Sequence, residues 1–510
     1  MPATSLLLLA GLPVAAALLI PLLPASTPAI RIRSIAALAC LAQLVVGLLS
    51  WRQPGMELHL SWLPRLGLAL ELGLDALSLP LVLLTALVSG LAILSAPADQ
   101  SRPRLFFPLL LATNIGTVVS FLSLNALLFV LAFELVLIPT TLLVAIWGGP
   151  KRAGAAIRYL MFGAVSGLSL LGGVLALGWL NSTGLSFSFH DLAQAQLPSG
   201  ARGWVLALLL LGFGLKLPVV PLHGWQPFTY GQASTPVVMM LAGCVSKLGA
   251  YGMLRFGVGF LPDTWAAWSP WIAAIGAVSA VYGALNAIAQ SDIRRLMAYS
   301  SLAHMGLLTL AVAAATPMSL QGAVAQVLAH GLIVALLFAC VGLIERKTGT
   351  TSIPELSGLM NPLRGLPFTM GMLLLAMMAA AGIPGLAGFP AELLVFEGSW
   401  TTFPRITLIC LLASGFTAVY AIRLFNRVGF GRLDNDRADW QATRWGERFP
   451  AMVLSVLVVA AGIWPQSLVG WSEPVSTDLA LRPVVQVVPR VGSREWSSLT
   501  ALIPDSLPAG

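Results

Sequence analysis

Charged side chains are scarce in this chain of 510 residues, where Asp, Glu, Lys and Arg together make up 9% and hydrophobic residues 57%. Soluble domains carry roughly a quarter of their residues as charges, so the composition excludes an ordinary soluble enzyme. The net charge of +8 comes from basic residues spread over short segments, which form no patch for a nucleic acid. We therefore predict an integral membrane protein that binds the lipid bilayer and no nucleic acid.

Cysteine is also rare, and its four residues stand singly in apolar segments, at Cys40, Cys244, Cys340 and Cys410. No pair has the C-x-x-C spacing that is typical of iron–sulfur and zinc sites. No G-x-G-x-x-G motif indicates a dinucleotide fold. We expect no metal and no cofactor on this chain, so any redox chemistry belongs to partner subunits.

Long apolar segments are abundant. A hydrocarbon core about 30 Å thick is crossed by roughly 20 apolar residues in a helix, and about fourteen segments have that length. The predicted fold is therefore all-α and multi-pass. The expected helices cover 3–23, 33–51, 75–96, 104–123, 125–147, 154–180, 203–232 (interrupted), 235–260, 266–289, 293–315, 319–345, 366–398 (interrupted), 402–428 and 449–472.

Lys and Arg favour one set of loops. Seventeen of them fall in or beside the loops after odd-numbered helices, and five in the others, namely Arg52, Arg65, Arg202, Arg255 and Arg405. Because cytoplasmic loops are rich in Lys and Arg, the odd loops are predicted to face the cytoplasm and both termini the exterior. Residues 473–510 are expected to form an exterior tail.

A few ionisable residues stand inside or at the start of apolar segments. A charge at the bilayer centre costs on the order of 2.5–3.5 kcal/mol, and such residues usually mark an ion path. For any one of them alone, a packing charge satisfied by a partner is the alternative. Both signs recur over successive helices, which favours a proton path through Glu134, Lys216, Lys247, His304, His330 and Glu392.

Two apolar segments are interrupted by Pro and Gly. Pro218 and Pro221 follow Lys216, and Gly382 and Pro384 precede Glu392. Broken helices in corresponding places of two halves are typical of inverted-repeat transporters, with ion sites at the breaks. The alternative is that the prolines merely kink long helices.

The expected organisation has four parts. Helices 1–3 occupy 1–100, and the final helix and tail occupy 431–510. Between them, helices 4–8 over 101–262 and helices 9–13 over 263–430 would form two inverted five-helix repeats, each containing one of the breaks.

Five motifs follow one another in an order that resembles one known family. They are FELVLIP (133–139), KLPVVPLHGW (216–225), SKLGAYGMLRFG (246–257), AQSDIRRLMAYSSLAHMG (289–306) and GIPGLAGFPAELLVF (382–396). The family comprises the antiporter-like membrane subunits of respiratory complex I and its photosynthetic relatives. The subunit is called NuoM in bacteria, subunit 4 in mitochondria and NdhD in cyanobacteria and chloroplasts, and the resemblance covers about residues 70–430.

The resemblance implies a fold of fourteen helices and a role in moving protons across a membrane. It implies a coupled pair of Glu134 and Lys216, a central Lys247, connecting residues His304 and His330, and a terminal carboxylate at Glu392. NAD(P)H or ferredoxin, iron–sulfur clusters and quinone would be bound by partner subunits, which include a second antiporter-like subunit. The membrane would be a bacterial inner membrane or a cyanobacterial thylakoid.

One segment departs from the family pattern. After Trp225, proton-pumping relatives commonly read LPDAH, whereas this chain reads QPFTY over 226–230. An acid and a histidine are thus replaced by Phe228 and Tyr230, which resembles NdhD variants of complexes specialised for CO2 uptake. Two alternatives stay open: a subunit of a multi-subunit cation/proton antiporter, and a structural spacer without transport.

Overall fold

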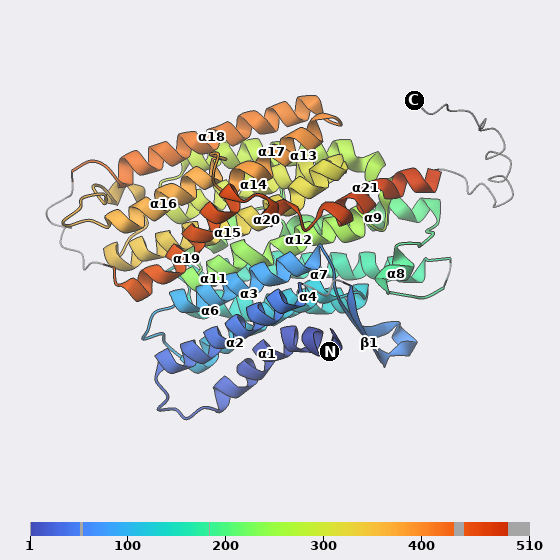
Figure 1. Cartoon of the computed structure of the whole chain (residues 1–510), viewed down its shortest axis with the longest axis horizontal. Coiled ribbons are helices and arrows are strands. Elements are labelled where there is room, and N and C mark those ends of the chain that lie inside the picture. Colours follow the sequence, from blue (N-terminus) through green and yellow to red (C-terminus); the bar gives the residue numbers. More distant parts are fainter. Residues whose placement is uncertain (1, 52–54, 183, 433–442, 488–510) are drawn as a thin grey trace, which may run out of the picture.

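The protein is a bundle of helices that run roughly side by side along the longest axis of the molecule (Figure 1). The structure is a computed structural model that describes residues 2–51, 55–182, 184–432 and 443–487. Arg52, residues 433–442 with Arg437, and the last part of the expected tail, 488–510, lie outside the described residues.

Thirteen helical segments of the described residues are long and apolar enough to cross a membrane. They are α1 (Pro2–Leu22), α2 (Ala29–Ser50), α3 (Ser78–Ser95), α4 (Pro103–Leu122), α5 with α6 (Ala126–Leu135 and Leu137–Trp147), α7 (Arg152–Trp179), α9 (Ser199–Lys216), the segment that joins α11 (Thr235–Met240), η2 (Leu241–Val245), α12 (Lys247–Gly252) and η3 (Met253–Val258), then α13 (Pro262–Ala289), α14 (Ile293–Ala314), α15 (Pro317–Thr348), α18 (Pro404–Val428) and α19 (Trp445–Ile463). The expected fourteenth helix is the interrupted pair α16 (Pro367–Ala380) and α17 (Gly388–Trp400). The all-α, multi-pass prediction is confirmed, while the inverted symmetry of the two repeats stays a prediction.

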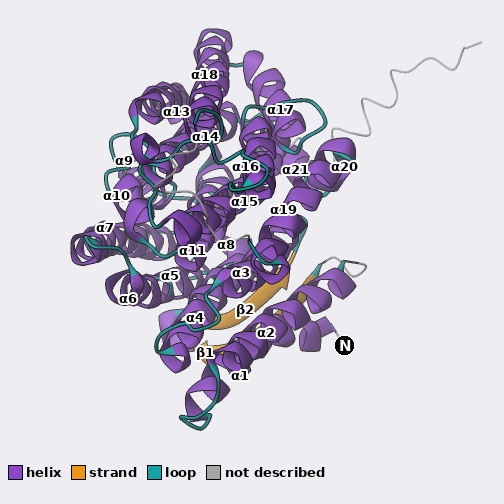
Figure 2. Cartoon of the chain, turned by 90° about the vertical axis from the view of Figure 1, so that its left-hand side faces the viewer, coloured by secondary structure: helices purple, strands orange, loops and turns teal. Residues whose placement is uncertain are grey.

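Helix α15 lies in the middle of the bundle. Seen nearly end-on in Figure 2, it lies between α14 and α17 on one side and α3 and α11 on the other, whereas α1 and α2 lie at an edge. Its apolar segment is entirely buried, as are those of α14 and of the segment from α11 to η3. The ionisable residues on these three elements are therefore enclosed by protein rather than by lipid.

Both interruptions occur where Pro and Gly predicted them. Helix α9 ends at Lys216, and regular helix resumes only with α10 (Gln226–Gln232). Helix α16 ends at Ala380, where Gly382 and Gly385 have φ values of +68° and +89°, a region that favours glycine. The chain leaves the helical path at both places, so the alternative of simple kinks is wrong.

Helix 5 has a small discontinuity that the sequence analysis did not predict. Val136 separates α5 from α6, two residues after Glu134. Pro139 has no N–H group to donate to the carbonyl of Leu135, so one helical hydrogen bond is missing at this point. The apolar segment still crosses as one unit, and the interruption lies beside the carboxylate of Glu134.

The segment before α3 forms a β-hairpin that we did not predict. Strand β1 (Met56–Leu63) pairs antiparallel with β2 (Leu68–Leu74), around the short turn η1 (Pro64–Leu66). Its apolar residues alternate with polar ones, which is the pattern of a half-buried strand. The hairpin lies at the end of the bundle where the N-terminus also lies (Figure 1).

The region after α18 also differs from expectation. The last crossing helix ends at Ile463 rather than 472, because Pro465 cannot continue it. Two further helices follow, α20 (Gln466–Val469) and α21 (Glu473–Val487), so the first part of the expected tail is helical. The remaining short elements are α8 (Phe189–Leu192) and η4 (Ile353–Glu355).

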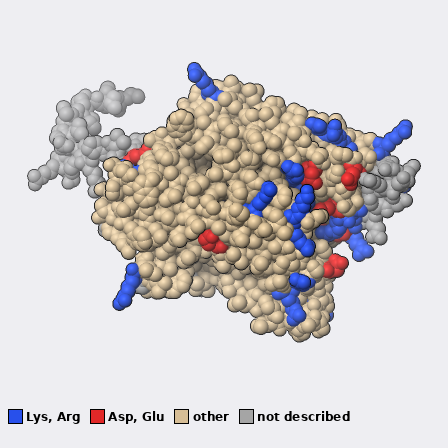
Figure 3. Space-filling model, turned by 180° about the vertical axis from the view of Figure 1, so that it is seen from behind, with Lys and Arg blue, Asp and Glu red and all other residues tan. Residues whose placement is uncertain are grey.

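Charge on one face of the molecule is concentrated at one end (Figure 3). Figure 3 shows most Lys and Arg of that face gathered at the end opposite the hairpin, with a broad and largely uncharged band beside them. One basic residue was misplaced by the loop count: Arg255 lies within η3, where its guanidinium contacts the carboxylate of Asp75. The apolar band has the character of a lipid-facing surface.

Candidate functional site

Glu134 stands near the end of α5, on a half-buried face. Its carboxylate lies against the backbone of Gly167 on α7, so closely that a Cβ at residue 167 would be 1.9 Å from Oε1. Only glycine leaves room for the carboxylate here. The contact fixes Glu134 at the interface of α5 and α7, in an environment of low dielectric constant.

Lys216 is the last residue of α9 and is 4% exposed. The C-terminal end of a helix carries partial negative charge, which stabilises a cation placed there. Its Nζ lies 4.6 Å from the ring centroid of Phe133 and 5.7 Å from that of Tyr159, within the range of cation–π contacts. Trp225 caps the same helix end, because its Nε1 donates to the carbonyl of Leu215 at 2.8 Å.

Glu134 and Lys216 act on each other electrostatically without forming an ion pair. Each charge influences the other, yet no nitrogen–oxygen distance between them falls within 4.0 Å. The coupled pair that the family resemblance implies therefore has no direct salt bridge in this structure. The aromatic rings of Phe133 and Tyr159 hold the ammonium instead.

Lys247 lies deep in the bundle and is fully buried. It begins the short helix α12, which lies between two π-helical turns, η2 and η3, and π-turns are frequent at functional sites. Its Nζ lies 2.6 Å from Nδ1 of His330 on α15 and 3.5 Å from Oγ of Ser246. Because an ammonium only donates, Nδ1 of His330 accepts this hydrogen bond through its lone pair.

His304 on α14 uses both ring nitrogens. Nδ1 lies 2.8 Å from the carbonyl oxygen of Ser300, and Nε2 lies 2.9 Å from that of Ala380. A carbonyl oxygen only accepts, so both nitrogens must donate, and the ring that satisfies both contacts is the imidazolium. Ala380 is the last residue of α16, so the second break supplies a negatively polarised carbonyl to this cation.

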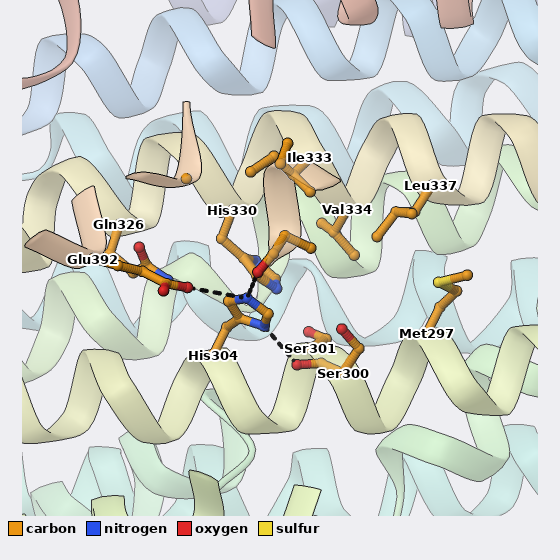
Figure 4. Close-up of a pocket in the computed structure, with 13 residues that line it drawn as sticks. Met297, Ser300, Ser301, His304, Gln326, His330, Ile333, Val334, Leu337 and Glu392 are labelled. Atoms are coloured by element: carbon orange, nitrogen blue, oxygen red, sulfur yellow. Dashed lines mark hydrogen bonds and ion pairs between the residues drawn. The ribbon is translucent and has the colours of Figure 1, made fainter. Parts of the chain in front are cut away.

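Glu392 on α17 completes the row. Its Oε1 lies 3.5 Å from Nε2 of His304, and its Oε2 accepts a hydrogen bond of 2.7 Å from Ser414 on α18. The rings of His304 and His330 are 5.5 Å apart between centroids. Figure 4 shows His304 between Glu392 on one side and His330 above it. The structure thus brings together Lys247, His330, His304 and Glu392 in one continuous buried row.

A small cavity follows this row. It is lined by polar groups that include Ser300, Ser301 and Gln326, and its volume of about 10 Å³ is close to what one water molecule needs. Oε1 of Gln326 and Oε1 of Glu392 are buried acceptors without a hydrogen-bonding protein partner. A water molecule between these side chains would satisfy acceptors that the protein leaves unpaired.

Comparison with known proteins gives this arrangement a context. Residues 123–417, more than half of the chain, match the family described as NADH:quinone oxidoreductase/Mrp antiporter, TM. NAD(P)H-quinone oxidoreductase chain 4 1 of Synechococcus elongatus is 36% identical over 456 residues, which are 87% of this chain and 84% of that protein. The chain belongs to this family.

Solved structures agree with this membership. A chain of respiratory complex I from Thermus thermophilus with bound NADH has a TM-score of 0.85 and 28% identity, and the match covers 94% of this chain and 99% of that one. A chain of the Mrp complex from Dietzia has a TM-score of 0.84 at 19% identity, covering 94% and 97%, which shows a shared fold. Among the described residues, no group of three His, Cys, Asp or Glu side chains could hold a metal ion.

Sequence reasoning missed several members of the site. Gly167 cradles Glu134, Ser414 binds Glu392, and Tyr159 faces Lys216. Glycine and serine are too frequent in apolar helices for their position alone to indicate such contacts. Only the arrangement of the helices in the bundle brings these side chains together.

Proposed function

We propose that the chain conducts protons across a membrane as the antiporter-like subunit of a type-I NAD(P)H-quinone oxidoreductase. The observation that carries the proposal is the buried row of Lys247, His330, His304 and Glu392, in which each member is in contact with the next or faces it. Groups of this kind bind and release protons. Burying them in a membrane costs free energy, so their presence indicates a function.

The relatives' names favour the oxidoreductase over the stand-alone antiporter. The curated relatives are named NAD(P)H-quinone oxidoreductase chain 4, whereas the likeness to the Mrp complex concerns the fold alone. NAD(P)H or ferredoxin, iron–sulfur clusters and quinone would be held by partner subunits, among them a second antiporter-like subunit. Electron transfer there would supply the free energy that this chain uses.

The proposed mechanism begins at Glu134 and Lys216. With the ammonium near, the carboxylate is favoured in its ionised form; with the ammonium withdrawn, burial favours the protonated acid. Lys216 is positioned for such movement because aromatic rings hold it instead of an ion pair. Each tenfold change in proton affinity requires about 1.4 kcal/mol, so a modest coupling energy from the partner subunits is enough.

The orientation and the setting of the complex are part of the proposal. The end rich in Lys and Arg would face the cytoplasm, with both termini on the exterior or lumenal side. Phe228 and Tyr230, in place of an acid and a histidine, support a specialised complex coupled to CO2 uptake. Its membrane would then be a cyanobacterial thylakoid.

Replacing Glu134 tests the proposal. In membrane vesicles that carry the whole complex, Glu134→Gln should assemble normally but lose most proton translocation per electron, because the amide keeps the shape and cannot titrate. Glu134→Asp should retain part of it. If Glu134→Gln vesicles moved protons at the wild-type ratio to electron transfer, the carboxylate would be structural and the chain would fit the role of a spacer.

A further inference from the structure

The proposed path has a gap in its middle. Glu134 and Lys216 form one group and Lys247 with His330 begins another, and no contact among the described residues joins Lys216 directly to Lys247. The two groups are held by neighbouring elements, since α12 packs so tightly on the end of α9 that a Cβ at Gly249 would lie 2.7 Å from the nitrogen of Leu217. Two buried tyrosines, Tyr159 and Tyr230, lie beside these groups.

Tyr159 on α7 is the first of these. Its side chain is 2% exposed, its ring lies 5.7 Å from Nζ of Lys216, and its hydroxyl has the side chains of Thr140 and Glu134 as neighbours. The hydroxyl makes no hydrogen bond with a protein group in the described residues. Tyr159 therefore places a phenol without a hydrogen-bonding protein partner beside the first group.

Tyr230 on α10 is the second. It is fully buried, and its hydroxyl is also unpaired. The side chains with which this hydroxyl interacts are those of Tyr159, Gln226 and Ser246. Ser246 in turn lies 3.5 Å from Nζ of Lys247. Tyr230 thus has as neighbours both the phenol of the first group and Ser246, which contacts the lysine of the second.

Gln226 connects α10 to the cavity beside the histidines. Its Nε2 donates to Oγ of Ser301 at 3.3 Å, and Ser301 lines the cavity that His304 and His330 share. Its Oε1 and the hydroxyl of Thr229 are buried and unpaired. Four unpaired polar atoms thus occur on Tyr159 and on α10, beside the first break.

Four buried polar atoms without hydrogen-bonding partners among the described residues destabilise the fold, which suggests that they serve a function. A buried polar group without a partner costs about 1–3 kcal/mol, and Phe would fill the same volume as Tyr without that cost. Tyr159 and Tyr230 both pack edge-to-face against Trp225, so ring packing alone does not require their hydroxyls. Unpaired hydroxyls in a row are the groups that water molecules bridge.

We propose that Tyr159 and Tyr230, with Gln226 and Ser246, form the connection through which protons pass between the Lys216 group and Lys247. The inference rests on the proposed function and names the residues of its missing link. Each phenol oxygen accepts a proton on a lone pair while its own O–H bond breaks toward the next acceptor, so the tyrosine ends neutral. Hydroxyl rotation then restores the starting orientation.

The test uses vesicles with the intact complex, in which electron transfer and proton uptake are measured together. Tyr159→Phe and Tyr230→Phe should each lower the protons moved per electron severalfold, while the amount of chain in the complex stays unchanged. Tyr230→His, which can accept and donate, should restore most of the ratio. Tyr251→Phe is the matched control, because its hydroxyl is equally buried and hydrogen-bonds outside this link to Phe121 and Arg255.

The outcomes separate the two proposals. Suppose that Glu134→Gln lowers the protons moved per electron, while the Tyr159→Phe/Tyr230→Phe double variant keeps the wild-type value. This result would overturn the proposed connection and leave the proposed function intact. A wild-type ratio in Glu134→Gln would overturn the proposed function. If the tyrosine variants fail to assemble, Ser246→Ala, a smaller change in the same link, decides: a lowered ratio supports the connection and an unchanged ratio overturns it.

Discussion

Nζ of Lys247 lies 2.6 Å from Nδ1 of His330, inside the bundle and away from lipid. The lysine donates this hydrogen bond, so one of its protons lies between Nζ and Nδ1. His304, whose two carbonyl contacts require a cation, lies next along the row. A proton that leaves Lys247 therefore approaches a positive neighbour, and Glu392 beyond it supplies the compensating charge.

Lys247→Arg tests whether Lys247 must release a proton or need only carry a positive charge. Guanidinium stays protonated under all ordinary conditions, so the variant keeps the cation but cannot pass its proton on. We expect normal assembly and a proton step slowed on the order of a hundredfold. Dye-monitored proton uptake by vesicles, divided by the rate of electron transfer, is the measurement. Lys151→Arg, at an exposed loop lysine, is the control and should match wild type.

Gly167→Ala tests the position of Glu134. The new methyl group would meet Oε1 at 1.9 Å, so the carboxylate must move, and overpacking of this kind costs about 1–3 kcal/mol. Proton translocation should fall severalfold with the complex assembled. Gly172→Ala on the same helix meets only a Leu208 methyl at 3.6 Å, an ordinary contact, and should have no effect. Equal behaviour of the two variants would mean that the carboxylate's position is unimportant.

Glu392→Gln removes the negative charge beside His304 while keeping a similar shape. The imidazolium then loses its counter-ion, and we expect roughly tenfold slower translocation or worse. Glu397→Gln, on an exposed face of the same helix α17, removes one carboxylate without touching the row. The ratio of protons to electrons should distinguish the two variants, and a normal ratio in Glu392→Gln would exclude this carboxylate from the path.

Asp75→Asn tests stability rather than transport. Burial acts to raise the pKa of the Asp75 carboxyl, but Arg255 and the hydrogen bonds of Ser78 outweigh it and hold the pKa below its usual 3.8. Replacing the carboxylate leaves the largely buried guanidinium of Arg255 without its partner, which should cost about 1–3 kcal/mol. The fraction of this chain that stays soluble on heating the detergent-solubilised complex is the measurement, with Asp99→Asn in an exposed turn as control.

The pH dependence of that stability difference has a definite sign. A depressed pKa in the folded state means that the stabilisation is complete above the ordinary pKa and is lost as the pH falls through the lower, folded value. The gap between wild type and Asp75→Asn should therefore be constant from neutral pH down to about 4 and shrink only below it. A gap that closed between neutrality and pH 5 would point to another titrating group.

The sequence predicted the path of the chain better than its contacts. Pro218, Pro221 and the glycines before Glu392 predicted both broken helices, because these residues limit the backbone locally. The contact between Lys247 and His330 joins residues 83 positions apart, so no local pattern predicts it. The aromatic contacts of Lys216 have the same origin: only the fold places the rings of Phe133 and Tyr159 around the ammonium.

The hairpin was missed for a different reason. Its alternating apolar residues are a strand signal, but a search for twenty-residue apolar blocks passes over it. Strand pairing also depends on the register between β1 and β2, in which Leu58 faces Leu72 and Leu60 faces Leu70. Helix α21 lies in a segment whose Pro and Ser content suggested a tail, and packing of Leu479, which is 3% exposed, overrides that local signal.

All four cysteines are buried, each at most 1% exposed. Thiol-reactive reagents that cannot enter the bundle should leave the native chain unlabelled, so no background thiol needs to be removed. Asp99→Cys, or Ser182→Cys at an exposed residue toward the other end, introduces the only reactive thiol on this subunit. Labelling of sealed vesicles with a membrane-impermeant maleimide then reads which end faces outward, directly and without reference to the distribution of charge.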